Sequence, residues 1–184
     1  MPLLREKLLA GRRIALGAVP APVGAALREL GAELDSLTAE QLPSDEHEVG
    51  EWARARAPLH GVVWDGAGAF GTGGQTGLDA TLDAAWAVVR EVATGALIPG
   101  QAPAKVLLIA PRPDAGAFAG AARAGLENLV RTLSVEWARY GVSSALIAPG
   151  EEACDERLAE LVCFAVSEAG DYLSGCCLEL GLVR

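Results

Sequence analysis

Residues 105–150 read KVLLIAPRPDAGAFAGAARAGLENLVRTLSVEWARYGVSSALIAPG and contain a complete strand–helix–strand unit. Residues 105–110 form a nearly continuous apolar run, which is typical of a strand in a parallel sheet covered on both faces. Helical periodicity follows over 119–140, and a second apolar run over 142–148 ends at Pro149-Gly150. A strand, a helix and a strand in this order predict parallel strands joined by a crossover helix.

The same alternation continues on both sides of this unit. Apolar runs predict further strands over 13–17, 32–37, 61–65 and 176–180. Helical patterns with caps or stop signals predict helices over 23–30, from Ser44 to Pro58, from Thr76 to before Pro99, and over 155–166. A glycine-rich loop is predicted over 66–77. We therefore predict one domain over 1–184 with an α/β fold, a Rossmann-like three-layer sandwich of about six mostly parallel strands with helices on both faces.

Composition excludes several classes of protein. The 184 residues carry a formal net charge of −9, which disfavours nucleic acid and anionic lipid as main partners. No apolar run approaches the roughly 20 residues of a membrane span, and the first residues lack the apolar stretch of a signal peptide. The four cysteines fit no metal-binding spacing, so we expect no metal site, free thiols and a cytoplasmic location.

Four segments together resemble one enzyme family. Residues 122–137 (ARAGLENLVRTLSVEW), 147–150 (IAPG), 171–181 (DYLSGCCLELG) and 65–68 (DGAG) occur in the order and spacing of short-chain dehydrogenase/reductases. The likeness is to ketoacyl-reductase-like members and covers most of the chain from Gly61 onward. The chain is similar to a degenerate and shortened member of this family.

The resemblance implies a reaction, and the sequence lacks the residues for it. The family transfers a hydride between NAD(P) and a carbonyl or alcohol, using a tyrosine, a lysine four residues later, a serine and an asparagine. The tyrosine and lysine positions fall on Ala119 and Arg123, the serine position near Ala110 or Pro111, and the asparagine position near Ala85 or Trp86. A methyl group has no proton to transfer, so we expect no catalytic residues.

The positions that would bind the cofactor are altered as well. The family's first turn is glycine-rich, whereas here the chain is shorter between Gly17 and Gly31 and contains Pro20 and Pro22, which lack N–H donors. A short interval between the second and third strands predicts a sheet shortened at one edge. We expect no cofactor and only vestigial cofactor positions at Gly17, Gly66, Gly68, Pro149 and Gly150. The GxGxxG pattern over 66–71 is too weak alone to predict phosphate binding.

Both long helices are predicted to be apolar on two sides. The core stripes are predicted to comprise Leu78, Leu82, Trp86, Val89 and Ala93 in the first helix, and Ala122, Leu126, Leu129, Val130, Leu133 and Trp137 in the second. In the resembled family these helices and the last strand form subunit contacts. The predicted interface comprises Ala80, Ala84, Ala87, Val88, Ala121, Ala124, Gly125, Asn128 and Val135, together with the strand at 176–180.

Three functional hypotheses remain at this point. The first is a catalytically inactive subunit that forms a homo-oligomer, or a hetero-oligomer with an active short-chain dehydrogenase. The alternative is an NAD(P)-dependent oxidoreductase that acts on a carbonyl or alcohol through Tyr140, Tyr172 or Arg123. The third is a ligand sensor with a pocket where the cofactor would lie. His60 and Asp35 are not predicted to take part in any of them.

Overall fold

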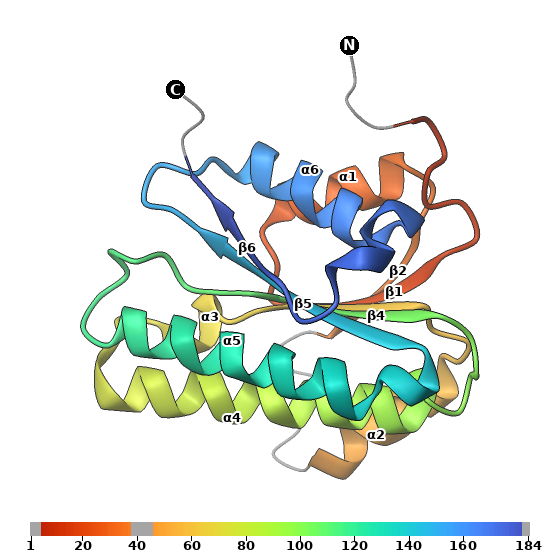
Figure 1. Cartoon of the computed structure of the whole chain (residues 1–184), viewed down its shortest axis with the longest axis horizontal. Coiled ribbons are helices and arrows are strands. Elements are labelled where there is room, and N and C mark those ends of the chain that lie inside the picture. Colours follow the sequence, from red (N-terminus) through yellow and green to blue (C-terminus); the bar gives the residue numbers. More distant parts are fainter. Residues whose placement is uncertain (1–4, 38–45, 182–184) are drawn as a thin grey trace.

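The computed structural model describes residues 5–37 and 46–181 and shows a sheet flanked by helices (Figure 1). Its strands are β1 (Arg13–Gly17), β2 (Glu33–Leu37), β3 (Gly61–Asp65), β4 (Ala104–Ile109), β5 (Val142–Pro149) and β6 (Cys177–Leu180). Its helices are α1 (Ala21–Glu29), α2 (Glu46–Ala55), α3 (Ala67–Phe70), α4 (Gly74–Val92), α5 (Ala119–Glu136) and α6 (Asp155–Val166). Shorter helical turns, η1 (Ala93–Leu97), η2 (Ala138–Tyr140) and η3 (Glu168–Leu173), follow α4, α5 and α6.

The strands lie in the order β2-β1-β3-β4-β5-β6, and every neighbouring pair is parallel. All residues of β3 and β4 are buried because helices cover both faces of the central strands. This confirms the predicted α/β fold with about six parallel strands. Dinucleotide-binding sheets in the order 3-2-1-4-5-6 continue beyond their second strand. Within the described residues, β2 is the end of the sheet, in line with the expected shortening at one edge.

Two hydrophobic cores hold the helices on the sheet. Helices α1 and α6 cover one face, and α2, α4 and α5 cover the other (Figure 1). Leu27, Val63 and Ile147 are among the fully buried residues of the first core. Trp64 and Leu126 belong to the second core, which is the larger of the two. Each layer of helices presents its apolar stripe to the sheet, as expected of a layered α/β protein.

The buried stripe of α4 differs from the prediction. Thr81, Ala85 and Val88 face the sheet, whereas Leu82 is half-buried and Trp86 is 41% exposed. Small side chains pack on the sheet here, and the hydroxyl of Thr81 donates a hydrogen bond to the carbonyl of Gly66. Because Val88 is only 1% exposed, it belongs to the core and its assignment to a subunit interface was wrong.

The buried stripe of α5 follows the prediction closely. Ala122, Leu126, Val130 and Leu133 are buried against the sheet. Gly125 contacts α4 within the chain, because a Cβ atom at this position would lie 2.7 Å from Cδ2 of Leu82. The small size of Gly125 therefore permits a close helix–helix contact inside the subunit.

The glycine-rich segment predicted as a loop over 66–77 contains two helical pieces instead. The one-turn helix α3 lies within it, and α4 begins at Gly74, before the predicted start at Thr76. The residue before α4 is Gly73, which has no side chain to cap the helix, and within the first turns the Gln75 amide donates a hydrogen bond of 2.7 Å to the Asp79 carboxylate. The predicted N-cap of the preceding helix, Ser44, lies outside the described residues.

No helix in the described part of the chain has the length and apolar character needed to cross a membrane. The four cysteines, Cys154, Cys163, Cys176 and Cys177, are free thiols. Across 5–37 and 46–181, no three His, Cys, Asp or Glu residues are grouped so that they could hold a metal ion. The cytoplasmic location and the single domain stay predictions.

Candidate functional site

The candidate site lies where β1, β3, β4 and β5 end. Ligands of parallel α/β proteins bind outside the carboxyl ends of the strands. Here this edge holds a cavity of about 110 Å³, whose lining includes Asp65, Ala110, Arg112, Pro149 and Asp155. The strand register brings these residues together, since Asp65 pairs with Ile109 at the end of β3 and Ile147 pairs with Ile109 near the end of β5.

Helix α5 begins at this edge, with the positions of the family's tyrosine and lysine in its first turns. Ala119 is 2% exposed and packs against Phe70 and Ala122. Its methyl group can neither donate nor accept a proton. Arg123 lies one turn later, and its Nη1 donates hydrogen bonds of 2.8 Å to the carbonyl oxygens of both Pro111 and Pro149. The guanidinium thus ties the end of β4 to the end of β5.

Gly17 makes room for a side chain of the neighbouring strand. It pairs with Trp64 across β1 and β3, and a Cβ atom at position 17 would lie 2.0 Å from Cε3 of the Trp64 ring. The ring is buried, and its indole Nε1 has no hydrogen-bond partner among the described residues. The close approach at Gly17 is therefore to an indole ring, whereas in dinucleotide-binding turns such a glycine lets backbone approach a pyrophosphate.

The start of α1 offers few donors to a phosphate. Pro20 is the residue before the helix, and Pro22 stands in its first turn without an N–H group. The N–H of Val23 donates to the Pro20 carbonyl at 3.0 Å. Helix N-termini bind phosphate through free backbone N–H groups, so this turn is poorly suited to the task.

A second arginine joins the loops that follow β4 and β5. Nη1 of Arg112 donates to the carbonyl of Gly150 at 3.0 Å and to that of Glu151 at 3.4 Å. Its Nη2 forms an ion pair of 3.3 Å with Asp155 at the start of α6. Arg112 and Arg123 together engage the carbonyls of Pro149 and Gly150, two of the predicted vestigial cofactor positions.

Asp65 is a titratable group at the end of β3 for which no role was predicted. It is 5% exposed, and its Oδ1 accepts the N–H of Ala67 at 2.8 Å. The pKa of Asp65 is raised to about 6, mainly by burial and also by the Asp155 carboxylate, while the Ala67 N–H and Arg112 act in the opposite direction. An acidic residue at the end of the otherwise apolar strand GVVWD was the signal that could have indicated it.

The remaining vestigial positions, Gly66 and Gly68, are near this carboxylate. Gly66 is buried, and its N–H donates to the carbonyl of Ile109 at 2.9 Å. A Cβ atom at Gly68 would make only an ordinary contact of 3.6 Å with that of Ala18. The segment that carries the GxGxxG pattern thus includes α3, and its first glycine, Gly66, is hydrogen-bonded to β4.

A nicotinamide dinucleotide does not fit this edge as it stands. Pockets for drug-sized ligands have volumes of about 300–1,000 Å³, and the cavity here has about 110 Å³. Arg112 and Arg123 bond to the backbone carbonyls that follow β4 and β5, where a cofactor would need open backbone. A ligand sensor that binds a dinucleotide-sized molecule would need an open crevice at this edge. The cavity of about 110 Å³ is too small for such a ligand.

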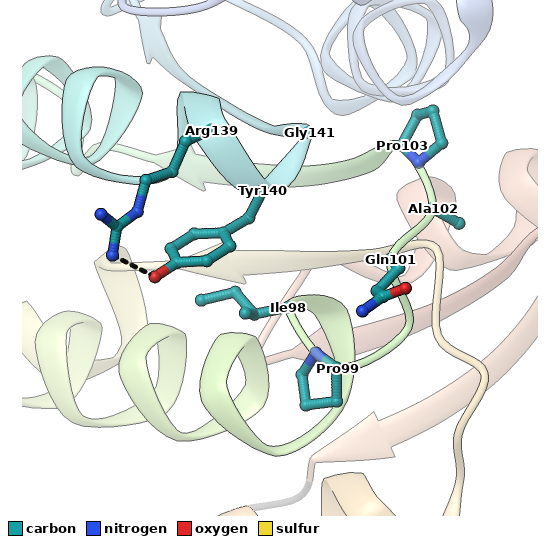
Figure 2. A pocket seen from close by; sticks show the side chains of 8 residues that line it. All are labelled: Ile98, Pro99, Gln101, Ala102, Pro103, Arg139, Tyr140 and Gly141. Carbon is teal, nitrogen blue, oxygen red and sulfur yellow. Dashed lines mark hydrogen bonds between the residues drawn. The ribbon is translucent and has the colours of Figure 1, made fainter.

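A larger hollow of about 690 Å³ lies at the opposite end of the sheet, beside the starts of β4 and β5 (Figure 2). Ile98, Pro99 and Pro103 form part of its wall, and Arg139 donates a hydrogen bond to the Tyr140 hydroxyl there. Tyr140 follows the end of α5, whereas Arg123 is near its start. The structure therefore does not bring Tyr140 and Arg123 together into one site.

Tyr172, the other tyrosine of the alternative hypothesis, is 94% exposed on η3. Tyr172 is not among the residues that line the cavity at the carboxyl edge of the sheet. Neither tyrosine therefore lies among the residues that line the cavity at this edge.

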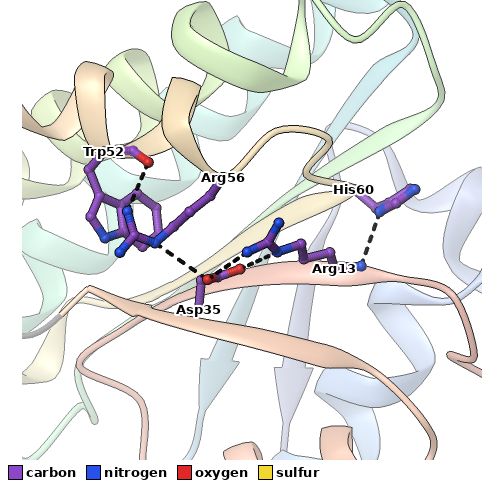
Figure 3. Close-up of polar contacts among 5 residues, drawn as sticks. All are labelled: Arg13, Asp35, Trp52, Arg56 and His60. Carbon is purple, nitrogen blue, oxygen red and sulfur yellow. Dashed lines mark hydrogen bonds and ion pairs between the residues drawn. The ribbon is translucent and has the colours of Figure 1, made fainter.

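Asp35 and His60 belong to a polar cluster away from this edge (Figure 3). Asp35 accepts two hydrogen bonds from Arg13, of 2.6 and 3.1 Å, and forms an ion pair of 3.4 Å with Arg56. Nδ1 of His60 accepts the backbone N–H of Arg13 at 3.0 Å, and burial is the main cause that lowers the pKa of His60. The cluster joins β1, β2 and α2.

Comparison with known proteins rests on structure, because no protein-family model and no curated protein match the sequence. A citronellol catabolism dehydrogenase (AtuB) from Pseudomonas aeruginosa superposes with a TM-score of 0.75 and 22% identity, over 97% of this chain and 96% of that one. The RhlG/NADP active-site complex from the same species gives 0.75 and 17%, over 96% and 98%. A Serratia marcescens short-chain dehydrogenase/reductase gives 0.72 and 17%, over 94% and 97%.

The chain has a short-chain dehydrogenase/reductase-like fold. Identities of 15–22% over nearly whole chains establish this architecture, and fold alone does not determine activity. The expected resemblance is therefore confirmed at the level of the fold.

Proposed function

We propose that this chain is a non-catalytic subunit with a short-chain dehydrogenase/reductase-like fold, and that it acts by assembling with other subunits. The observation that carries the proposal is the state of the first turns of α5. Ala119 supplies a methyl group where the family has its proton donor, and both hydrogen bonds of Arg123 Nη1 go to backbone carbonyls. A hydride transfer to a carbonyl needs a proton source at that point.

The absence of a cofactor is part of the same proposal. The indole ring over Gly17, the two prolines at the start of α1 and the small cavity all favour it. Binding of NAD(P) at this edge would need Arg112 to move, and this would break its hydrogen bonds to the Gly150 and Glu151 carbonyls and its ion pair with Asp155.

Exposed apolar side chains on α4 and α5 support the assembly part. Trp86 is 41% exposed and Val135 is 76% exposed. Ala80, Ala121 and Ala124 are exposed as well, and Ala84 and Ala87 are half-exposed. A helix that is apolar on its outer side as well as its inner side is usually covered on both. Strand β6 adds a free sheet edge, which readily pairs with another chain.

The partner is proposed to be a second copy of this chain or a catalytically complete homologue. The net charge of −9 does not favour nucleic acid or anionic membranes. Small side chains permit close helix packing between subunits, so a partner presenting a similar pair of helices would suit this face.

Turnover and cofactor binding provide the first test. Purified protein is assayed for NADH- and NADPH-dependent reduction of carbonyl compounds, and its Tm is measured with millimolar dinucleotide. We expect no turnover and no shift in Tm, since a ligand that binds the folded state must raise its stability. A saturable rise in Tm with turnover would contradict the proposal and favour the NAD(P)-dependent oxidoreductase.

Assembly is tested by mass in solution. We expect the wild-type chain, alone or with its co-purified homologue, to exceed the monomer mass, and Ala124→Glu to abolish the excess. Ala25→Glu is the matched control, because Ala25 is also an exposed helical alanine but lies on α1, across the sheet. Equal masses for wild type and Ala124→Glu would show that this helix face is not the contact.

A further inference from the structure

The cavity at the carboxyl edge contains a carboxylate that forms no ion pair with any residue the structure describes, although Arg112 also lines the cavity. Asp65 lines it and is 5% exposed. One oxygen, Oδ1, accepts the N–H of Ala67. The other, Oδ2, has no hydrogen bond or ion pair with any described residue. Burying a charge without a partner is costly, so a group that neutralises it would be stabilising.

Nearby charged groups leave the cavity negative when Asp65 is ionised. Arg112 is paired with Asp155 and also donates to the carbonyls of Gly150 and Glu151. That ion pair is neutral as a unit, and Asp65 adds one negative charge. The cavity therefore favours a ligand with a single positive charge.

The walls and the volume restrict the ligand further. Ile109, Ala110 and Leu158 contribute apolar surface, and all three are buried. About 110 Å³ accommodates a few water molecules or an organic ion of a few heavy atoms. The described residues near Asp65 do not form a set that could hold a metal ion, so an ion with an apolar part suits the cavity better.

We propose that this cavity binds a small primary ammonium ion, of the size of methylammonium or ethylammonium, with its N–H groups on Asp65 and its alkyl group against Ile109, Ala110 and Leu158. The contact is a charge-assisted hydrogen bond to a carboxylate that has a free oxygen. Selectivity over bulkier cations follows from the volume, and selectivity over alkali ions follows from the apolar walls. The site goes beyond assembly and stands whether or not the chain oligomerises.

The titration of Asp65 supports this site. Because burial holds the pKa of Asp65 at about 6, an ammonium ion that binds the carboxylate must compete with a proton below that pH. Binding is therefore expected to strengthen between pH 5 and pH 7.5 and to release a proton on the way.

The experiment measures Tm for the full chain at pH 7.5 in methylammonium or ethylammonium chloride, against potassium chloride and tetraethylammonium chloride at equal ionic strength. We expect a saturable rise in Tm with the two primary ammonium ions only, with half-saturation in the millimolar range because so small a ligand makes few contacts. The amide resonance of Ala67, whose N–H is bonded to Asp65, is expected to shift over the same concentrations.

Two variants test the location of the binding site. Asp65→Asn keeps the oxygen that accepts the Ala67 N–H but removes the charge, and it is expected to lose the response. Ala67→Leu keeps the carboxylate but places a larger side chain at the cavity lining. Because Ala67 is exposed, the fold should tolerate the change, and this variant is also expected to lose the response to ammonium ions. Glu156→Gln, an exposed carboxylate on α6, is the control that keeps the full response. Equal effects of potassium and methylammonium, or a response that persists in both cavity variants, would overturn the proposal.

Discussion

The carboxyl edge of the sheet and the outer face of α4 and α5 differ in how far other residues of the same chain cover them. At the edge, Arg123, Arg112 and Trp64 bond to or cover backbone of the same chain. On the helix face, Trp86 and Val135 remain 41% and 76% exposed. The edge where the fold usually holds a ligand is thus largely closed from within. The surface available to another molecule lies mainly on the helices.

This comparison gives matched pairs of substitutions, with one member at the edge and one on the helix face. Edge residues are constrained by their neighbours, so substitutions there should alter stability. Residues on the helix face have few neighbours in the subunit. The same chemical change there should alter the stability of the monomer little, or only through helix propensity.

The largest effect is expected for Gly17→Ala. The added Cβ would lie 2.0 Å from the Trp64 ring, and overpacking of a well-packed core costs at least about 3 kcal/mol in a contact this close. Gly120→Ala on α5 has open space around it and should stabilise by about 0.5 kcal/mol. Urea unfolding measures both. In a Trp64→Leu background the cost of Gly17→Ala should fall sharply, and an unchanged cost would mean that the indole ring is not the obstacle.

Asp65→Asn should change the pH dependence of stability. The pKa of about 6 in the folded protein, against an ordinary 3.8, means that the folded state holds a proton that the unfolded state releases between these values. Wild-type stability should therefore decrease as pH rises through this window, by up to about 3 kcal/mol.

The Asp65→Asn variant lacks this decrease and should become more stable relative to wild type up to pH 7. Unfolding in urea from pH 4 to pH 8 measures the difference. Asp83→Asn on the exposed side of α4 is the control for removing one negative charge. A constant difference in stability between Asp65→Asn and wild type across this range would contradict the prediction.

Arg123→Ala is expected to destabilise by about 2 kcal/mol, because it removes two hydrogen bonds from a charged group and leaves two buried carbonyls without their donor. The partner substitution is Arg131→Ala on the same helix. Arg131 pairs with Glu127 at 2.6 Å but its side chain is 63% exposed, so its loss should cost no more than about 0.5 kcal/mol. Similar costs for the two arginines in urea unfolding would argue against a structural role of Arg123 at the edge.

The smallest effect is expected for Ala18→Gly in the turn before α1. Ala18 has a φ of +56°, a left-handed conformation that glycine adopts without strain. The substitution should stabilise by about 1 kcal/mol, whereas Ala121→Gly on α5 should destabilise by about 1 kcal/mol. Thermal unfolding shows whether the two substitutions change the stability in these opposite directions. The Ala18→Gly variant should still show no response to dinucleotide, since the indole ring and the prolines remain.

Periodicity and turn signals predicted most of the fold. The stretch 105–150 indicated β4, α5 and β5 nearly to the residue, and the buried stripe of α5 followed its apolar spacing. The same reasoning placed Val89 and Ala93 in the core correctly, but it was wrong for Trp86 and Leu82, which turn toward solvent and α5. Which apolar side chains of this helix face the sheet depends on the space available there, and small Thr81 and Ala85 fit it.

The candidate site was predicted in part. That Ala119 and Arg123 stand at the family's catalytic positions stays a prediction from the resemblance, and a sequence cannot show that Arg123 bonds to the carbonyls of both Pro111 and Pro149, which are 12 and 26 residues away. An acidic residue at the end of the apolar strand GVVWD indicates a buried carboxylate at Asp65, but the sequence does not indicate the small cavity beside it.

By itself, the amino-acid sequence determined the parallel α/β architecture, the absence of an ionisable side chain at position 119 and the apolar stripes of the two long helices. Each of these follows from local patterns or from a residue's own chemistry. The tertiary structure alone decided how the carboxyl edge is closed, why Gly17 has no side chain and how strongly Asp65 holds its proton. These properties depend on distances and burial among residues far apart in the chain, which only the folded arrangement sets.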